Sequence, residues 1–284
     1  MKKGKSAGVD IIPGELVHSG RGDVITALTA ICNKIWQTEE WPTAWAQSLV
    51  ITLPKKGNLQ QCQNYRTINF ISHTSKVMLK IILNRSKPQA EKIFVEEQAG
   101  FRAGRNTTKE IFNLRILYEK YLQHQQDFYY VFIYFKKDFD SVWHADLWAN
   151  MKKYISDNLI RVIKNLFDKA TSAVVFSGSV GDWFRTTLGV LQGCLLSPTL
   201  FNIFLGRIMA DNIEEHEGTV SIRGRTITNL CFADDIDGVA GEEEELAKLV
   251  ERLDNACTAY GMEISAEKTK LMTENTVALT QRLK

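Results

Sequence analysis

The stretch that decides the fold is residues 226–240, TITNLCFADDIDGVA. Its apolar and β-branched residues predict two short strands joined by a tight turn that contains Asp234 and Asp235. Adjacent carboxylates add nothing to strand packing, but in a hairpin turn they can emerge at the rim of a sheet. Paired carboxylates there can hold Mg²⁺, a hard cation that prefers oxygen ligands. An Asp-Asp pair is also common in turns for conformational reasons alone, so this segment does not decide the function by itself.

The residues around this turn predict a mixture of helices and strands. Residues 128–135, FYYVFIYF, indicate a buried central strand. Further strands are expected over 47–53, 172–177, 183–188 and 269–273. Helices are expected over 24–37, 74–86, 108–122, 139–153, 157–169, 198–214 and 242–260. The elements do not alternate regularly as βαβ units, so we expect the α+β class.

Two helix starts carry recognisable capping signals. Asp23 precedes the first periodic helix and is a candidate N-cap. Thr107 and Glu110 have the spacing of a capping box before the helix expected at 108–122.

Composition excludes several classes of protein. The chain has 284 residues, of which 44% are hydrophobic and 24% charged, so it is neither disordered, collagen-like nor a coiled-coil array as a whole. Five scattered cysteines without a CxxC pair argue against a disulfide scaffold or zinc ribbon and favour a reducing compartment. No signal-peptide core or membrane-length apolar stretch is visible. We therefore expect a soluble intracellular protein, cytoplasmic or nuclear.

Charge is distributed unevenly along the chain. Residues 1–130 carry 18 Lys and Arg against 11 Asp and Glu, whereas residues 131–284 carry 17 against 22. A basic half beside an acidic half suits a polyanion held near a metal-binding centre. Two ordinary solvated surfaces would give the same numbers.

Five further segments complete a recognisable order of motifs: PKKGNLQQCQNYR at 54–66, GFRAGR at 100–105, VFIYFKKDFDSV at 131–142, GVLQGCLLSPTLF at 189–201 and GMEISAEKTK at 261–270. With FADD at 232–235, they make the chain resemble the reverse transcriptase domain of non-LTR (LINE-like) retrotransposons. The resemblance extends from Gly8 to about Met272.

The resemblance implies an architecture and an activity. The fold would be a right-hand polymerase, with a fingers-like region at 1–125 and a palm-like region at 126–284 whose antiparallel sheet is packed by helices. The activity would be RNA-directed DNA polymerisation, which adds deoxynucleoside triphosphates to a DNA primer along an RNA template. The resemblance gives no oligomeric state and implies no membrane partner.

The resemblance also implies roles for individual residues. Asp234 and Asp235 match the metal-binding pair that holds Mg²⁺, or alternatively Mn²⁺. Phe139 matches the bulky residue under the sugar, which excludes a 2′-hydroxyl, and Lys268 matches a proton donor to pyrophosphate. The remaining nucleotide-binding positions are Lys55, Lys56, Arg66, Gln192 and Gly193.

Each of these positions also has an ordinary structural explanation. Lys55 and Lys56 suit a solvated turn, and Arg66 suits an exposed surface. Gly193 can satisfy a backbone that needs a positive φ, and Phe139 can be plain core. The functional interpretation rests on the occurrence of all the motifs together and in order.

One departure from the family pattern affects the chemistry. The first palm motif of the family reads Asp-Phe-x-Lys-Ala-Phe-Asp, but here Tyr134 occupies the position of the first aspartate. A phenol is neutral at pH 7 and supplies no anionic metal ligand. Asp138 replaces the alanine of the motif and Asp140 matches its second aspartate, so Asp138 is the candidate substitute.

Other departures are smaller. Thr67, Leu191 and Leu195 replace residues that are usually Pro, Arg and Pro in the family. Few residues follow Met272, so we expect the thumb to be absent and the grip on a duplex to be weak.

Three hypotheses follow from these observations. The first is a reverse transcriptase domain, impaired by Tyr134. The second is a catalytically inactive remnant that acts at most as a nucleic-acid-binding module. The third is an RNA-templated RNA polymerase, against which Phe139 argues.

Overall fold

The structure is a computed structural model that describes residues 4–213, 218–222 and 224–274. The chain divides into two compact units, and each unit is assembled from two separate stretches. The first unit contains residues 1–92 and 147–197, and the second contains 93–146 and 198–284. The expected boundary between residues 125 and 126 falls within the second unit, and the assignment of fingers and palm stays a prediction.

The first unit combines a small mixed sheet with helices. Its strands are β1 (Gln47–Pro54), β2 (Tyr65–Ile71), β5 (Thr171–Phe176), β6 (Ser179–Val180) and β7 (Phe184–Arg185). Its helices are α1 (Gly14–Ser19), α2 (Gly22–Thr38), α3 (Thr43–Ala46), η1 (Cys62–Asn64), α4 (His73–Ala90) and α7 (Asp157–Lys169). The sheet order is β2-β1-β5-β6, with β7 also paired to β5.

The β1–β2 hairpin is the part of the first unit that positions candidate site residues. The two strands are antiparallel from Ser48↔Ile71 to Pro54↔Tyr65, and β5 pairs parallel on the other side of β1. Apolar side chains from α4 and α7 are buried in the core beside this sheet, among them Ile82 and Ile163.

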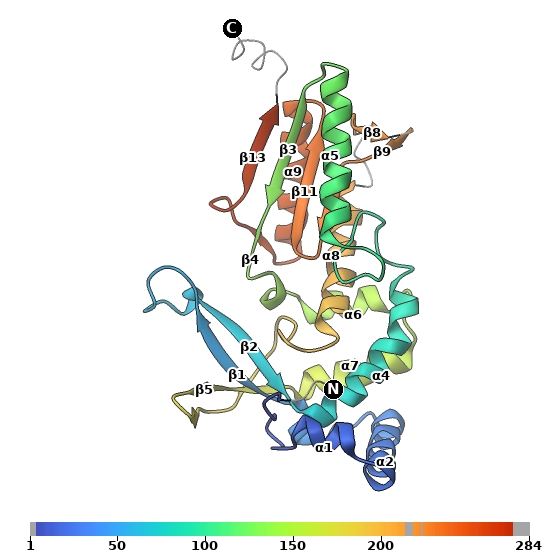
Figure 1. The fold of residues 1–284 in the computed structure, drawn as a ribbon, viewed down its shortest axis with the longest axis vertical. Helices are drawn as coiled ribbons and strands as arrows, with labels where there is room; N and C mark the ends of the chain where they lie inside the picture. The colour runs from blue at the N-terminus through green and yellow to red at the C-terminus, as the bar shows by residue number, and fades with distance from the viewer. Residues whose placement is uncertain (1–3, 214–217, 223, 275–284) are drawn as a thin grey trace. The chain divides into compact units, whose positions relative to one another are not determined.

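The second unit is built around a four-stranded antiparallel sheet. Its order is β10 (Asn229–Phe232), β11 (Asp235–Ala240), β3 (Phe128–Ile133) and β13 (Lys270–Glu274). Figure 1 shows β13, β3 and β11 side by side in this unit. Short pairs are formed by β4 (Phe135–Lys136) with β12 (Glu263–Ile264), and by β8 (Ser221–Ile222) with β9 (Arg225–Thr226).

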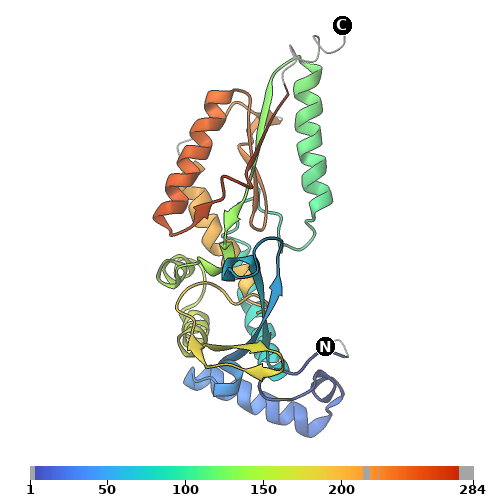
Figure 2. The same ribbon diagram turned by 90° about the vertical axis from the view of Figure 1, so that its left-hand side faces the viewer.

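Helices cover both faces of this sheet. Figure 2 shows α5 (Thr107–Gln123) on one face and α9 (Glu243–Ala259) on the other. On the α5 face, Leu117 and Tyr121 pack with Phe128, Leu230 and Val239. On the α9 face, the residues Leu246, Leu249 and Leu253 are buried.

Gly238 of β11 lies under α9, where there is little room for a side chain. A Cβ atom there would lie 3.0 Å from Val131 and 3.4 Å from Leu249. Hydrophobic burial on both faces therefore anchors β3 and β11, the two strands that lead to the acidic turn.

The chain passes between the units at three points, and two of these lie in helices. The helices are α6 (His144–Met151) and α8 (Ser197–Ile213). In the described ranges 4–213, 218–222 and 224–274, no helix is long and apolar enough to cross a membrane.

Both predicted N-caps are wrong. The N-cap of α5 is Asn106, whose side chain accepts a hydrogen bond from the Lys109 N–H at 2.9 Å. Asn106 has the extended backbone of an N-cap. The helix therefore begins one residue earlier than the capping box predicts, and Thr107 is its first residue. Asp23 lies in the first turn of α2, after the N-cap Arg21, and makes no capping bond.

Two predicted elements are interrupted, and several short elements as well as strand β2 were missed. The strand expected over 128–135 breaks at Tyr134, and the helix expected over 139–153 is replaced by η2 (Asp138–Asp140) followed by α6. Packing decides the second case, because the Phe139 ring stacks on the buried Phe201 and Val142 is fully buried. Strand β2 had no sequence prediction.

Candidate active site

The acidic turn is the two-residue connection of the β10–β11 hairpin. Phe232 pairs with Asp235, so Ala233 and Asp234 form the turn itself. Ala233 has φ 61°, in the left-handed region that costs an L-residue about 1–2 kcal/mol. The turn therefore needs support from surrounding structure.

Gln98 supplies that support, and sequence reasoning missed it. Its side chain is 3% exposed, its Nε2 donates to the Ala233 carbonyl at 3.1 Å, and its Oε1 accepts from the Ala233 N–H at 2.8 Å. The same oxygen accepts from the Gly100 N–H at 2.7 Å. Gln98 lies two residues before the recognised GFRAGR segment, and nothing in its local sequence signals a distant partner.

Asp138 lies beside Asp234. The register of the sheet pairs Ile133 with Ile236, which brings the end of β3 to the turn. The carboxyl groups of Asp138 and Asp234 lie within hydrogen-bonding reach of each other. Burial, followed by the charge of Asp234 and hydrogen bonding to it, raises the pKa of Asp138 to about 7.

Tyr134 lies at the break between β3 and β4. Its carbonyl accepts from the Ser265 N–H at 2.7 Å, and its N–H donates to the Thr269 hydroxyl at 3.4 Å. Because Ile133 pairs with Ile236, Tyr134 follows the strand at the level of Asp235. The side chain is 40% exposed, so a phenol lies at the end of β3.

Two more carboxylates of β11 have altered pKa values. Burial and the charge of Asp234 raise the pKa of Asp235. Burial, followed by the charges of Asp235 and Glu110, raises the pKa of Asp237 to about 6. The start of β11 is therefore a region where acidic groups raise one another's pKa values.

The remaining predicted residues of the second unit lie in η2 and in the connection between β12 and β13. Phe139 is half-buried and stacks on Phe201, with ring centroids 4.6 Å apart at 13°. Lys268 is exposed in the turn between β12 and β13, where its N–H donates to the Ser265 carbonyl at 3.1 Å.

The first unit gathers the other predicted residues around β2. Arg66 pairs with Leu53 in the β1–β2 register, and both Lys55 and Lys56 follow β1 in the connecting turn. All three basic side chains are exposed. The turn is closed by a hydrogen bond from the Lys55 N–H to the Asn64 carbonyl at 2.7 Å.

Gln192 and Gly193 lie against the same strand. The Asn69 N–H donates to the Gln192 carbonyl at 2.9 Å. Gly193 has φ 106°, and a Cβ atom there would lie 2.7 Å from the Asn69 carbonyl oxygen, so only glycine fits. The structure thus brings Gln192 and Gly193 to β2, three positions beyond Arg66.

The chemistry of the donor set suits a divalent cation. Asp138 and Asp234 are two adjacent carboxyl groups, and Asp235 follows in the chain, all with the hard oxygen donors that Mg²⁺ and Mn²⁺ prefer. The described residues contain no ready group of three or more His, Cys, Asp or Glu that could hold a metal ion. The fit therefore rests on the Asp138–Asp234 pair.

Comparison of the sequence with protein families gives a match over residues 53–281 to reverse transcriptase (RNA-dependent DNA polymerase). The chain is 23% identical over 234 residues to the RNA-directed DNA polymerase from the mobile element jockey of Drosophila melanogaster. It is 25% identical over 237 residues to the probable RNA-directed DNA polymerase from transposon X-element of the same species. These alignments cover 81% and 82% of the chain but 25% of each relative, so the chain spans about a quarter of their length.

A third relative is the Pol polyprotein from the type-1 retrotransposable element R2 of Popillia japonica, which is 25% identical over 80% of the chain and 32% of the relative. Among solved structures, apo telomerase of Candida tropicalis, truncated from its C-terminal domain, matches with a TM-score of 0.63. The identity is 14%, with 88% of this chain and 56% of that chain covered, so this likeness concerns the fold.

Proposed function

Because the chain belongs to the reverse transcriptase (RNA-dependent DNA polymerase) family, we propose that it is the RNA-directed DNA polymerase domain of a non-LTR retrotransposon. It would add deoxynucleotides to the 3′ end of a primer along an RNA template. In this proposal the second unit supplies the palm chemistry and the β1–β2 hairpin of the first unit acts as fingers.

The observation that carries the proposal is the close approach of the Asp138 and Asp234 carboxyl groups. Asp234 and Asp235 would hold the divalent cations, and Asp138 would supply the carboxylate that Tyr134 does not. When bound, such cations stabilise the attacking and departing oxygens of an in-line phosphoryl displacement. Two carboxyl groups close enough to share a hydrogen bond have the spacing that a common cation requires.

The other residues would bind and orient the nucleotide. Arg66 has a forked set of donors that suits the triphosphate, and Lys55 and Lys56 are compact charges for the same group. Gln192 and Gly193 would lie against the base pair that forms. Phe139 would exclude a 2′-hydroxyl, and Lys268 would donate a proton to the departing pyrophosphate.

Tyr134 favours a second candidate function. A reverse transcriptase that lacks its first palm carboxylate would be an inactive remnant, which would at most bind nucleic acid through its basic first half. Under that hypothesis Asp138 does not replace the missing ligand.

Primer extension on an RNA template, with Mg²⁺ or Mn²⁺, separates the two functions. We expect extension by the natural chain, its loss in Asp234→Ala, and an increase in Tyr134→Asp. Extension by Tyr134→Asp alone would identify the natural chain as a remnant. No extension by either chain would contradict the polymerase proposal.

A further inference from the structure

The segment from Val95 to Arg105 attaches to the free edge of β10. The Cys231 N–H donates to the Glu97 carbonyl at 3.1 Å, and the Ala99 N–H donates to the Cys231 carbonyl at 2.7 Å. Gln98 and Cys231 thereby form a parallel bridge. The segment therefore adds a single bridge to the edge of the sheet, directly beside the acidic turn.

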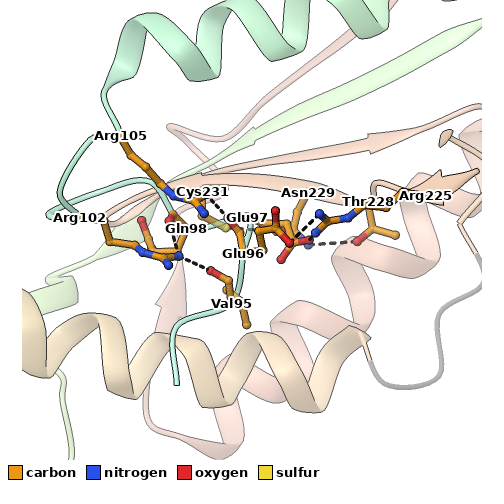
Figure 3. Close-up of polar contacts among 10 residues, drawn as sticks. All are labelled: Val95, Glu96, Glu97, Gln98, Arg102, Arg105, Arg225, Thr228, Asn229 and Cys231. Carbon is orange, nitrogen blue, oxygen red and sulfur yellow. Dashed lines mark hydrogen bonds and ion pairs between the residues drawn. The ribbon is translucent and has the colours of Figure 1, made fainter. Parts of the chain in front are cut away.

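Two arginine side chains hold residues 95–98 of this segment in place. Arg225 forms ion pairs with Glu96 at 2.7 Å and Glu97 at 2.8 Å, and Figure 3 shows its guanidinium directed at both carboxylates. Arg102, from the later part of the segment, donates back to the carbonyls of Val95 at 2.8 Å and Gln98 at 3.1 Å. These contacts fix the backbone around Gln98, and its side chain extends from this fixed backbone to the turn.

The approach of this segment to the turn is also unusually close. A Cβ atom on Gly100 would lie 2.1 Å from the Ala233 nitrogen, so no larger residue fits without displacement of the backbone. The Gly100 carbonyl accepts from Asn202 Nδ2 of α8 at 2.8 Å, which ties the same peptide to a buried helix.

We propose that Gln98 is the positioning residue for the acidic turn, because its buried carboxamide holds Ala233 in the left-handed conformation and so fixes where the Asp234 carboxylate points. The carboxamide satisfies the N–H and the carbonyl of Ala233 simultaneously. An aliphatic side chain could fill the space but could satisfy neither group. The part of this inference that concerns metal binding and catalysis rests on the proposed function.

The variants follow from the geometry. Gln98→Met removes all three hydrogen bonds at similar volume, whereas Gln98→Glu keeps an oxygen to accept from Ala233 and Gly100. Asn229→Leu is the matched control, since it removes a 2% exposed carboxamide from β10 whose bonds go to Thr228 and Cys231 and not to the turn. Gly100→Ala disturbs the turn by a second route.

The first measurement does not depend on activity. Hydrogen exchange of the Ala233 amide, followed by NMR in the metal-free chain, should become faster in Gln98→Met and Gly100→Ala. It should stay slow in Gln98→Glu and in the control. Unchanged exchange at Ala233 in Gln98→Met would overturn the proposal, whatever the chain does with a primer. Equally fast exchange of the Ala233 amide in Asn229→Leu would also overturn the proposal, because it would indicate a general loosening of β10.

The second measurement tests the consequence for Asp234. Mn²⁺ affinity, measured by electron paramagnetic resonance, and kcat for primer extension should each fall about 10- to 100-fold in Gln98→Met, with little change in KM for the nucleotide. Gln98→Glu should restore most of the loss. If the Ala233 amide exchanges faster in Gln98→Met but Mn²⁺ affinity and kcat are unchanged, the positioning role is overturned. If neither the natural chain nor Tyr134→Asp extends the primer, the result counts against the polymerase proposal but not against the role of Gln98 in the turn.

Discussion

The carboxyl groups of Asp138 and Asp234 lie within hydrogen-bonding reach of each other although they are nearly a hundred positions apart in the chain. The sheet register brings them together, because β3 ends where β11 begins. A pair of carboxyl groups this close and half-buried binds a proton more tightly than a free carboxyl does. The same pair of carboxyl groups therefore affects both the stability of the metal-free protein and its proposed catalytic chemistry.

Removal of the Asp138 carboxylate should abolish activity in the natural chain. We expect Asp138→Asn to lower kcat/KM for primer extension by about 10³-fold, equal to ~4 kcal/mol of transition-state stabilisation. The same change should cost far less in a Tyr134→Asp background, where the family's own carboxylate is restored. Asp127→Asn, at the opposite end of β3, is the control and should stay near the natural rate. Equal losses in the two backgrounds would show that Asp138 does not stand in for residue 134.

The stability of the metal-free protein should depend on the protonation of Asp138. Its folded-state pKa of about 7 lies above the unfolded value, so the folded protein binds this proton more tightly. The stabilising contribution is complete below the unfolded pKa, near pH 4, and is lost as the pH rises through about 7. Each pKa unit corresponds to about 1.4 kcal/mol.

Urea unfolding measures this effect. Between about pH 4.5 and 8, the unfolding free energy of Asp138→Asn should rise relative to that of the natural chain. Mg²⁺ at the higher pH should stabilise the natural chain more than the variant. If the difference in unfolding free energy between Asp138→Asn and the natural chain is the same at every pH, the raised pKa of Asp138 is contradicted.

The ring of Phe139 should control which sugar is accepted. In Phe139→Val, the space above Phe201 opens and a 2′-hydroxyl fits more easily, so the preference for deoxynucleotides over ribonucleotides should fall by about 10-fold or more. Competition between the two nucleotide types in primer extension measures this ratio. Phe132→Val, a half-buried phenylalanine of β3, should leave it unchanged. An unchanged ratio in Phe139→Val would leave Phe139 as a packing residue.

Phe128 should be essential to the core of the second unit. Its side chain is 1% exposed, and its ring centroid lies 5.3 Å from that of Tyr121 and 5.7 Å from that of Tyr130. Phe128→Ala should lower the free energy of unfolding by about 3–5 kcal/mol because it leaves a cavity. Phe176→Ala, at 74% exposure, should change it by less than about 0.5 kcal/mol. Similar losses in both variants would show that this cluster is not the main core.

The sequence predicts elements well where one periodic face is buried. The helix expected at 157–169 is α7 (Asp157–Lys169), because its apolar positions all face the interior of the first unit. The hairpin around Asp234 and Asp235 was likewise predicted, since two short apolar runs flank a polar turn. In both cases the signal lies within the element itself.

The features that sequence reasoning missed depend on distant residues. Gln98 becomes informative only because β10 lies beside it, and the proximity of Asp138 to Asp234 follows from a register that local patterns do not fix. Strand β2 was missed because its residues alternate weakly, and its pairing with β1 decides its conformation. Tertiary context overrides local preference at these positions.

The division of the chain into two interleaved units has a consequence for biosynthesis. Residues 1–92 can complete the first unit only after residues 147–197 have left the ribosome, by which time the first stretch of the second unit, 93–146, is already present without its partner. No single cut yields either unit alone. A nascent chain of this protein therefore passes through lengths at which both halves are unfinished, and chaperone binding should be greatest before residue 197 emerges.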